Sequence, residues 1–171
     1  MDVELLTGDD WKVLRDLRLD SLEDSPKAFL STDDAGEDRD EEYWRQRCAE
    51  GNWVVALSGH QAIGIACSVE GSDEPPDARY IQSVWVDPAR RRNGVLRAML
   101  RHLIALEPDV RTWFVWILDG NDVAREVYAR MGFETTRRRK ALKSDPERSE
   151  ERLMLAGLDY FTALSKRRSA P

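Results

Sequence analysis

The stretch from Ile81 to Leu106 constrains the fold more than any other part of the chain, because it reads as a strand, a basic turn and a helix without interruption. Its first residues are rich in β-branched and aromatic types, which favour strands. Asp87-Pro88 ends that strand, since proline cannot donate to a sheet ladder. A turn with three arginines and one glycine follows, and apolar residues then recur at helical spacing.

This order directs the N-terminus of a helix out of the end of a sheet. The first N–H groups of a helix have no partner within it, and they carry about half a positive charge that binds phosphate. Gly94 lacks a Cβ where a ligand would approach the backbone, and the neighbouring arginines add fork-shaped donors. The residues alone therefore predict a pyrophosphate site.

The chain resembles the GNAT superfamily of N-acetyltransferases at this turn and again further on. The family signature, R/Q-x-x-G-x-G/A after a strand that ends in V-x-P, is matched by residues 86–88 and 91–96, with Leu96 where glycine or alanine is usual. A second block, N-x-x-A-x-x-x-Y-x-x-x-G-F, is matched by residues 121–133. The similarity is clear over residues 52–133. It implies a GNAT-like acyl-CoA N-acyltransferase fold.

The order of the other segments also indicates a mixed α/β domain, with a central mixed sheet flanked by helices. One domain is expected from 171 residues, with its core over about 2–157 and a polar tail over 158–171. Such a sheet opens a ligand crevice at the carboxyl ends of its strands. Strands are predicted over residues 2–6, 53–57, 62–70, 80–86, 112–118, 133–137 and 152–156, and helices from Trp11 to a stop at Ser25-Pro26 and over residues 41–49, 95–106 and 122–131.

The resemblance implies acetyl-CoA as cosubstrate and direct transfer of its acetyl group to a primary amine in a ternary complex. It places the pyrophosphate on the backbone N–H groups of Arg92 to Arg97, and pantetheine on the strand before the turn, where a splay or bulge is expected. The side chain of Leu96 either narrows this approach or turns inward and leaves the amide exposed. The cofactor-binding residues implied in this way are Val84, Trp85, Val86, Arg91, Arg92, Asn93, Gly94, Val95, Leu96, Arg97 and Asn121.

Tyr128 is the candidate catalytic acid, because the resemblance places this tyrosine near the thioester sulfur. A phenol has an unperturbed pKa of about 10 and a thiol of about 8.5, so full proton transfer is uphill and hydrogen bonding to the developing charge suffices. The alternative is a packed tyrosine on an amphipathic helix. Asn121 would bind the cofactor, cap its helix or do both.

The group that takes a proton from the amine stays open at this point. An alkyl ammonium with a pKa of about 10.4 costs about 4–5 kcal/mol to deprotonate at neutral pH. Glu70, Asp119 and Glu134 are candidates for a base, and each is more simply explained as a solvated surface charge. Ser83 alternates with Val84 along the strand and is expected to line the acceptor pocket.

The net charge of −6 is concentrated in one acidic run from Asp33 to Glu42, where seven carboxylates face Arg39 alone. By resemblance, the segment between the first two helices rims the acceptor site, so we expect a cationic acceptor, either a small molecule or a peptide. A solvated flexible loop is the alternative. An acidic total also argues against a nucleic-acid partner.

Metal-binding, membrane-spanning and secreted proteins are not expected, because the sequence lacks their characteristic patterns. No His, Cys, Asp or Glu cluster has metal-ligand spacing, so no metal is expected. No apolar run approaches the roughly 20 residues of a membrane span, and no signal peptide is evident. We therefore expect a cytoplasmic protein without a membrane partner, in which Cys48 and Cys67 stay reduced. The resemblance also allows a homodimer.

The main rival to an enzyme is a regulatory GNAT-like module that holds CoA with little turnover. Leu96 and the lack of an evident base favour this rival. Tyr128 and Asn121 argue against it.

Overall fold

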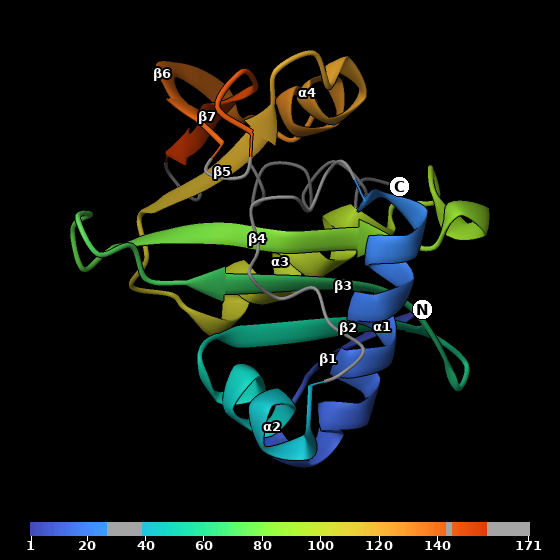
Figure 1. Ribbon diagram of the computed structural model, residues 1–171. Helices are drawn as coiled ribbons and strands as arrows, with labels where there is room; N and C mark the ends of the chain where they lie inside the picture. The colour runs from blue at the N-terminus through green and yellow to red at the C-terminus, as the bar shows by residue number, and fades with distance from the viewer. Residues whose placement is uncertain (27–38, 143–144, 157–171) are drawn as a thin grey trace, which may run out of the picture.

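The computed structural model describes residues 1–26, 39–142 and 145–156. Within these residues, one seven-stranded sheet has the order β1-β2-β3-β4-β5-β7-β6, and only β4 and β5 are parallel (Figure 1). The strands are β1 (Asp2–Leu5), β2 (Asn52–Ser58), β3 (Gln61–Val69), β4 (Ala78–Val86), β5 (Thr112–Leu118), β6 (Glu134–Ala141) and β7 (Ser149–Ala156). The α-helices are α1 (Trp11–Asp24), α2 (Glu41–Ala49), α3 (Val95–Leu106) and α4 (Asp122–Ala129). Two short 3-10 helices are η1 (Gly8–Asp10) and η3 (Pro88–Arg90).

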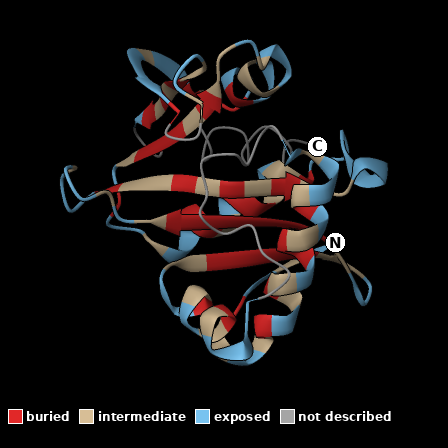
Figure 2. Ribbon diagram, in the orientation of Figure 1, coloured by how far each residue is buried: buried red, intermediate tan, exposed pale blue. Residues whose placement is uncertain are grey.

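Helices cover both faces of this sheet, with α1 in front of it and α3 behind it in Figure 1. Strand β2 is almost continuously apolar because both of its faces are buried. Val54 and Ala56 belong to the core under α3, whereas Trp53 and Val55 belong to the core under α1 and α2. Figure 2 shows buried residues along the central strands. The predicted mixed α/β fold is therefore confirmed.

The parallel pair β4 and β5 separates before either strand ends. Their ladder runs over four residue pairs and stops at Ile81 and Val115. Strand β4 nevertheless continues to Val86, and β5 continues to Leu118. The splay expected from the resemblance is thus present, and it leaves backbone groups of both strands without a partner across the gap.

A β-bulge lies in the separated part of β4. Ile65 of β3 pairs with Trp85, but Cys67 pairs with Gln82, so β4 contains one more residue than its partner. Ser83 lies inside this bulge and has a left-handed φ of 53°. Regular alternation of side chains, from which this serine was expected to face the acceptor pocket, does not continue through such a bulge.

The hairpin of β6 and β7 is longer than predicted. Strand β6 extends to Ala141, and β7 begins at Ser149, where the sequence had indicated a loop. The added residues are polar and lack the apolar alternation by which a strand is recognised. They are held by ladder pairing and by ion pairs such as that of Lys140 with Glu150, 3.4 Å from Nζ to Oε2.

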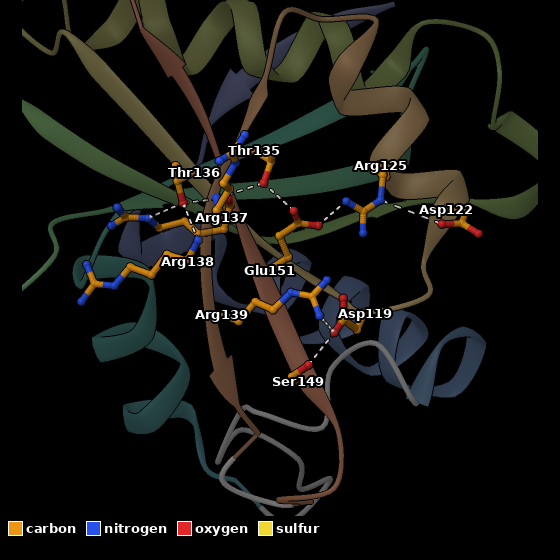
Figure 3. A network of polar contacts seen from close by, with 11 residues as sticks. Asp119, Asp122, Arg125, Thr135, Thr136, Arg137, Arg138, Arg139, Ser149 and Glu151 are labelled. Atoms are coloured by element: carbon orange, nitrogen blue, oxygen red, sulfur yellow. Dashed lines mark hydrogen bonds and ion pairs between the residues drawn. The ribbon is translucent and has the colours of Figure 1, made fainter.

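One carboxylate joins α4 to this hairpin (Figure 3). Glu151 of β7 is 5% exposed and accepts hydrogen bonds from the hydroxyl of Thr135 on β6 and from the guanidinium of Arg125 on α4. The Thr135 bond, followed by the Arg125 bond and charge, holds the pKa of Glu151 below its usual value despite burial. An ionised Glu151 therefore helps to hold α4 against the sheet.

None of the described helices combines the length and the apolarity that a membrane span requires.

Replacing Glu151 by Gln should lower the free energy of unfolding at neutral pH, because Arg125 loses the nearer and more buried of its two carboxylate partners. The pKa of Glu151 is lowered on folding, so its stabilisation is complete above the unfolded-state pKa of about 4.3 and is lost as the pH falls through the folded-state pKa. The difference between wild type and variant should therefore shrink in acid. Urea unfolding across a pH series measures this difference.

The control is Glu134→Gln, which removes an exposed carboxylate from β6 and should unfold like the wild type. A stability gap between Glu151→Gln and wild type that stays constant down to low pH would contradict the assignment.

Candidate functional site

A cleft of about 1500 Å³ lies where β4 and β5 separate, and the N-terminal ends of α3 and α4 also border it. Its lining includes Tyr128 and every residue for which the sequence predicted a role with the cofactor. These residues are Val84, Trp85, Val86, Arg91, Arg92, Asn93, Gly94, Val95, Leu96, Arg97 and Asn121.

The start of α3 presents open amides to this cleft. Gly94 precedes the helix with a left-handed φ of 77°, and no atom lies within 4 Å of the place where a Cβ would be. Arg92 also has a positive φ, 66°. The first amide to bond to a helical carbonyl is that of Ala98, 3.0 Å from the oxygen of Gly94, and among the described residues the amides from Arg92 to Arg97 donate to no backbone carbonyl. Such a run of amides forms an anion-binding concavity.

Leu96 does not close this concavity. Its side chain is half-buried and packs against the core beneath α3. This packing favours the inward one of the two orientations that the sequence allowed, and Leu96 also contributes to the cleft lining.

The guanidinium of Arg91 is engaged by the protein itself. Its Nε donates to the carbonyl of Val86 at 2.9 Å, and its Nη2 donates to Oδ2 of Asp24 at the end of α1. The indole Nε1 of Trp85 donates to the same Asp24 oxygen at 3.0 Å. Burial tends to raise the pKa of Asp24, but hydrogen bonds from Ser25, Trp85 and Arg91 outweigh this effect and lower the pKa.

The structure gives the Arg91 side chain a partner within the protein that the sequence did not predict. Its donors fix the turn against Asp24, and the role with the ligand that the sequence assigned to Arg91 stays a prediction. Trp85 is likewise a packed residue of the core under α1, and it forms part of the cleft wall.

Three other arginines of the cleft lining make no ion pair within the described residues. Arg92 lies in the turn, and Arg97 and Arg101 stand one helical turn apart on the exposed side of α3. Arg101 was missed at the sequence level, although its i, i+4 spacing from Arg97 could have identified it. Together they make this end of the cleft electropositive.

Tyr128 of α4 is 5% exposed, and its ring packs edge-on against Phe133 at 5.2 Å between centroids. Burial raises the pKa of the phenol, so it stays protonated at neutral pH and keeps an O–H that can donate a hydrogen bond. Asn121 caps α4 by accepting from the amide of Ala124 at 3.1 Å. Its side-chain NH2 has no acceptor within the described residues, so the cap leaves that donor available.

None of the three carboxylates considered as bases lines the cleft. Glu70 lies 3.3 Å from a guanidinium nitrogen of Arg79. Asp119 accepts from the hydroxyl of Ser149 at 2.6 Å and also pairs with an arginine of β6 (Figure 3). Glu134 is exposed on β6. These residues are structural or surface charges.

Three other carboxylates line the cleft, and Asp73 is the one of them that makes no ion pair within the described residues. Glu74 Oε1 accepts from the hydroxyl of Tyr80 at 2.8 Å and from Arg152 at 2.5 Å. Glu150 pairs with Lys140. Most of the acidic run that predicted a cationic acceptor, residues 33–38, lies outside the described residues.

Neither cysteine supplies a reactive thiolate. Burial raises the pKa of Cys48 to about 11 and that of Cys67 to about 12. Over the three described ranges, no group of three or more His, Cys, Asp or Glu side chains is placed to hold a metal ion.

Comparison with known proteins gives matches of three kinds. Residues 12–133 match the model of the Acetyltransferase (GNAT) family. The uncharacterized N-acetyltransferase YafP of Escherichia coli (strain K12) is 28% identical over 101 residues, which make up 59% of this chain and 58% of that protein. The alignment thus spans less than two thirds of this relative.

Solved structures share the fold at lower identity. Ribosomal-protein-alanine N-acetyltransferase from Brucella melitensis has a TM-score of 0.69 and 20% identity, over 91% of this chain and 99% of that one. The protein yncA from Salmonella typhimurium, solved with its cofactor acetyl-CoA, has a TM-score of 0.68 and 16% identity, over 91% of this chain and 93% of that one. The family model covers more than half of the sequence, and the chain therefore belongs to the acetyltransferase (GNAT) family.

Proposed function

We propose that the protein transfers the acetyl group of acetyl-CoA to a primary amine by direct attack in a ternary complex. One observation carries the proposal: the open amides of α3 and the phenol of Tyr128 line the same cleft between the separated strands. That cleft provides an anion site at one end and a buried hydrogen-bond donor further in. Pyrophosphate and thioester sulfur are the two groups of acetyl-CoA that need such partners.

The chain fits the cofactor through its backbone as much as through its side chains. The amides from Arg92 to Arg97 would hold the pyrophosphate, where Gly94 leaves the approach open. Arg97 and Arg101 would meet the remaining phosphate charge. The backbone of β4 beyond Ile81 would pair with pantetheine, because its ladder with β5 has ended there.

Tyr128 would act on the leaving sulfur. Its raised pKa increases the gap to a thiol of about 8.5, which makes full proton transfer less favourable than for an exposed phenol. Donation of a hydrogen bond to the developing thiolate requires no such transfer. We therefore assign Tyr128 the role of hydrogen-bond donor in the transition state.

We retain a cationic amine as the proposed acceptor, on the basis of the acidic run. Glu74 and Glu150 line the cleft but are paired with cations, so Asp73 or a water molecule would carry the amine proton away. The paired state of these carboxylates also favours a second candidate function, a regulatory module that binds acetyl-CoA with little turnover.

Release of free thiol from acetyl-CoA, measured with a panel of amines at two salt concentrations, tests the function. We expect turnover that is fastest with cationic amines and that falls as salt screens their attraction. Equal rates of thiol release with cationic and neutral amines would contradict the proposal that the acceptor is cationic. If acetyl-CoA bound in calorimetry but no amine released thiol, the binding module would be the better description.

Replacing Tyr128 by Phe should lower kcat by about 10²-fold, because the thiolate loses its donor. The Kd for acetyl-CoA should stay close to that of the wild type, since the phenol acts on charge that develops only during the reaction. Steady-state kinetics and calorimetry measure the two quantities. Tyr43→Phe on α2, away from the cleft, is the matched control and should be fully active. A fully active Tyr128→Phe protein would exclude the assigned role.

Asp24→Asn should weaken acetyl-CoA binding roughly tenfold, because Arg91 loses the anion that anchors the turn. Calorimetric titration of the two proteins compares the Kd values directly. Asp20→Asn lies one turn earlier on α1 and is the control, since Asp20 makes no hydrogen bond or ion pair with the turn among the described residues. Tighter binding by Asp24→Asn would mean that the guanidinium of Arg91, once released, serves the ligand instead.

A further inference from the structure

An alkylammonium group already lies in one part of the cleft, and it belongs to the protein itself. The Nζ of Lys140 is 4.3 Å from the centroid of the Trp116 ring and 3.4 Å from Oε2 of Glu150. All three residues line the cleft. The face of an indole ring and a carboxylate both attract an alkylammonium group. The cleft thus contains a binding site for such a group, with Lys140 in it.

The sheet brings these three side chains to one face. In the order β5-β7-β6, Glu150 of β7 is paired with Lys140 on one side and with Leu118 on the other. Residues directly opposite in a ladder share a face, and so do residues two apart along a strand. Trp116 precedes Leu118 by two positions on β5, so its ring lies on the same face as Glu150. Regular strands therefore hold the ring and the carboxylate in place.

Lys140 is held in this site only weakly. Its side chain is 51% exposed, whereas that of Glu150 is 9% exposed. Their separation of 3.4 Å is longer than the about 2.7–2.9 Å of a charge-assisted hydrogen bond between such ions. The flexible stem of a lysine lets its ammonium group move into water. Among the described residues Lys140 is the one cation paired with Glu150, so its departure would free the carboxylate for another cation.

The second cation near the ring is fixed more firmly. The guanidinium carbon of Arg152 lies 6.0 Å from the centroid of the Trp116 ring, and its Nη1 donates to Oε1 of Glu74 at 2.5 Å. The side chain of Arg152 is 12% exposed. Arg152 therefore stays with Glu74, and the position that a ligand can take is that of Lys140.

We propose that this site binds an alkylammonium group of the acceptor in place of Lys140, so that the preferred acceptor carries a second cationic group besides the amine that is acetylated. The inference rests on the proposed function and narrows its acceptor class. The bound ammonium keeps its proton and takes no part in the chemistry. The other amino group, once neutral, forms a C–N bond to the acetyl carbon. The C–S bond breaks, its electrons leave on the sulfur of CoA, and the amine proton passes to Asp73 or water.

Exchange of one ammonium for another conserves the charge at the site. Lys140 keeps its own charge in water, and Glu150 keeps a cation, so no buried carboxylate is left unpaired. An acceptor with two amino groups can place one of them at Trp116 and the other at the thioester. A monoamine cannot do both at once. The site therefore favours the acetylation of diamines over that of monoamines with the same chain length.

The test measures kcat/KM by thiol release from acetyl-CoA with the whole protein. The diamines are putrescine, cadaverine and hexamethylenediamine, each compared with the monoamine of the same chain length. A nonproductive complex lowers kcat and KM equally, so kcat/KM compares only the productive complexes. We expect at least one diamine to exceed its monoamine about tenfold in kcat/KM. Glu150→Gln should remove most of this difference, and Trp116→Phe should remove part of it, because phenylalanine is a weaker cation–π partner.

Lys140→Met should change the ratio of kcat/KM for diamine and monoamine in the opposite direction. It removes the group that competes for the site, so the ratio should rise by roughly threefold to tenfold, although loss of the ion pair lowers the free energy of unfolding. A purely structural role of this pair predicts no such gain. Arg139→Met is the matched control. It removes the neighbouring cation of β6, which lies outside the cleft lining and pairs with Asp119 at 2.9 Å (Figure 3), and it should leave the ratio unchanged.

Equal kcat/KM values for every diamine and its monoamine would overturn this inference and leave the proposed function intact. A Lys140→Met protein whose ratio does not rise would overturn it as well, since the lysine would then not compete with the acceptor. If acetyl-CoA bound in calorimetry but neither class of amine released thiol, the proposed function would fail, and this inference would fail with it.

Discussion

The early end of the parallel ladder between β4 and β5 is the constraint on which the site depends. Buried backbone N–H and C=O groups need partners, and a ladder that stops at Ile81 and Val115 withdraws those partners over the rest of both strands. The two helices that follow these strands, α3 and α4, begin at the same opening. Unpaired strand edges, open helix amides and a buried phenol therefore surround the same cleft.

Charge is distributed unevenly along this volume. Around the start of α3, Arg92, Arg97 and Arg101 have no carboxylate partner among the described residues, so the local field favours an anion. At the far end, the cations on β6 and β7 already face Glu74 and Glu150. The first region is ready to bind a phosphate, whereas in the second Glu74 and Glu150 must give up an internal pair before they can bind another cation. The proposed binding of acetyl-CoA therefore depends on unpaired arginines, whereas the proposed binding of the amine depends on carboxylates that are mostly paired already.

The sequence was informative where the determinants are local. The strand, turn and helix around Gly94 and the capped helix of Tyr128 follow from short patterns, and their residues do line one cleft. It failed where distant residues decide the outcome: the carboxylate that engages Arg91 is 67 positions away. The extension of β6 and β7 was missed for another reason, since a polar edge hairpin held by ion pairs has no apolar period to detect.

Asp24 is shared by α1, by the indole of β4 and by the turn before α3. Its carboxylate balances the charge of Arg91, so loss of either residue alone leaves the other as an unneutralised ion. We therefore expect positions 24 and 91 to vary together among related sequences, because a chain that lacks the acid no longer has this partner for the arginine. Correlated substitution of residues 24 and 91 among related sequences would then reflect the one carboxylate oxygen of Asp24 that three elements share.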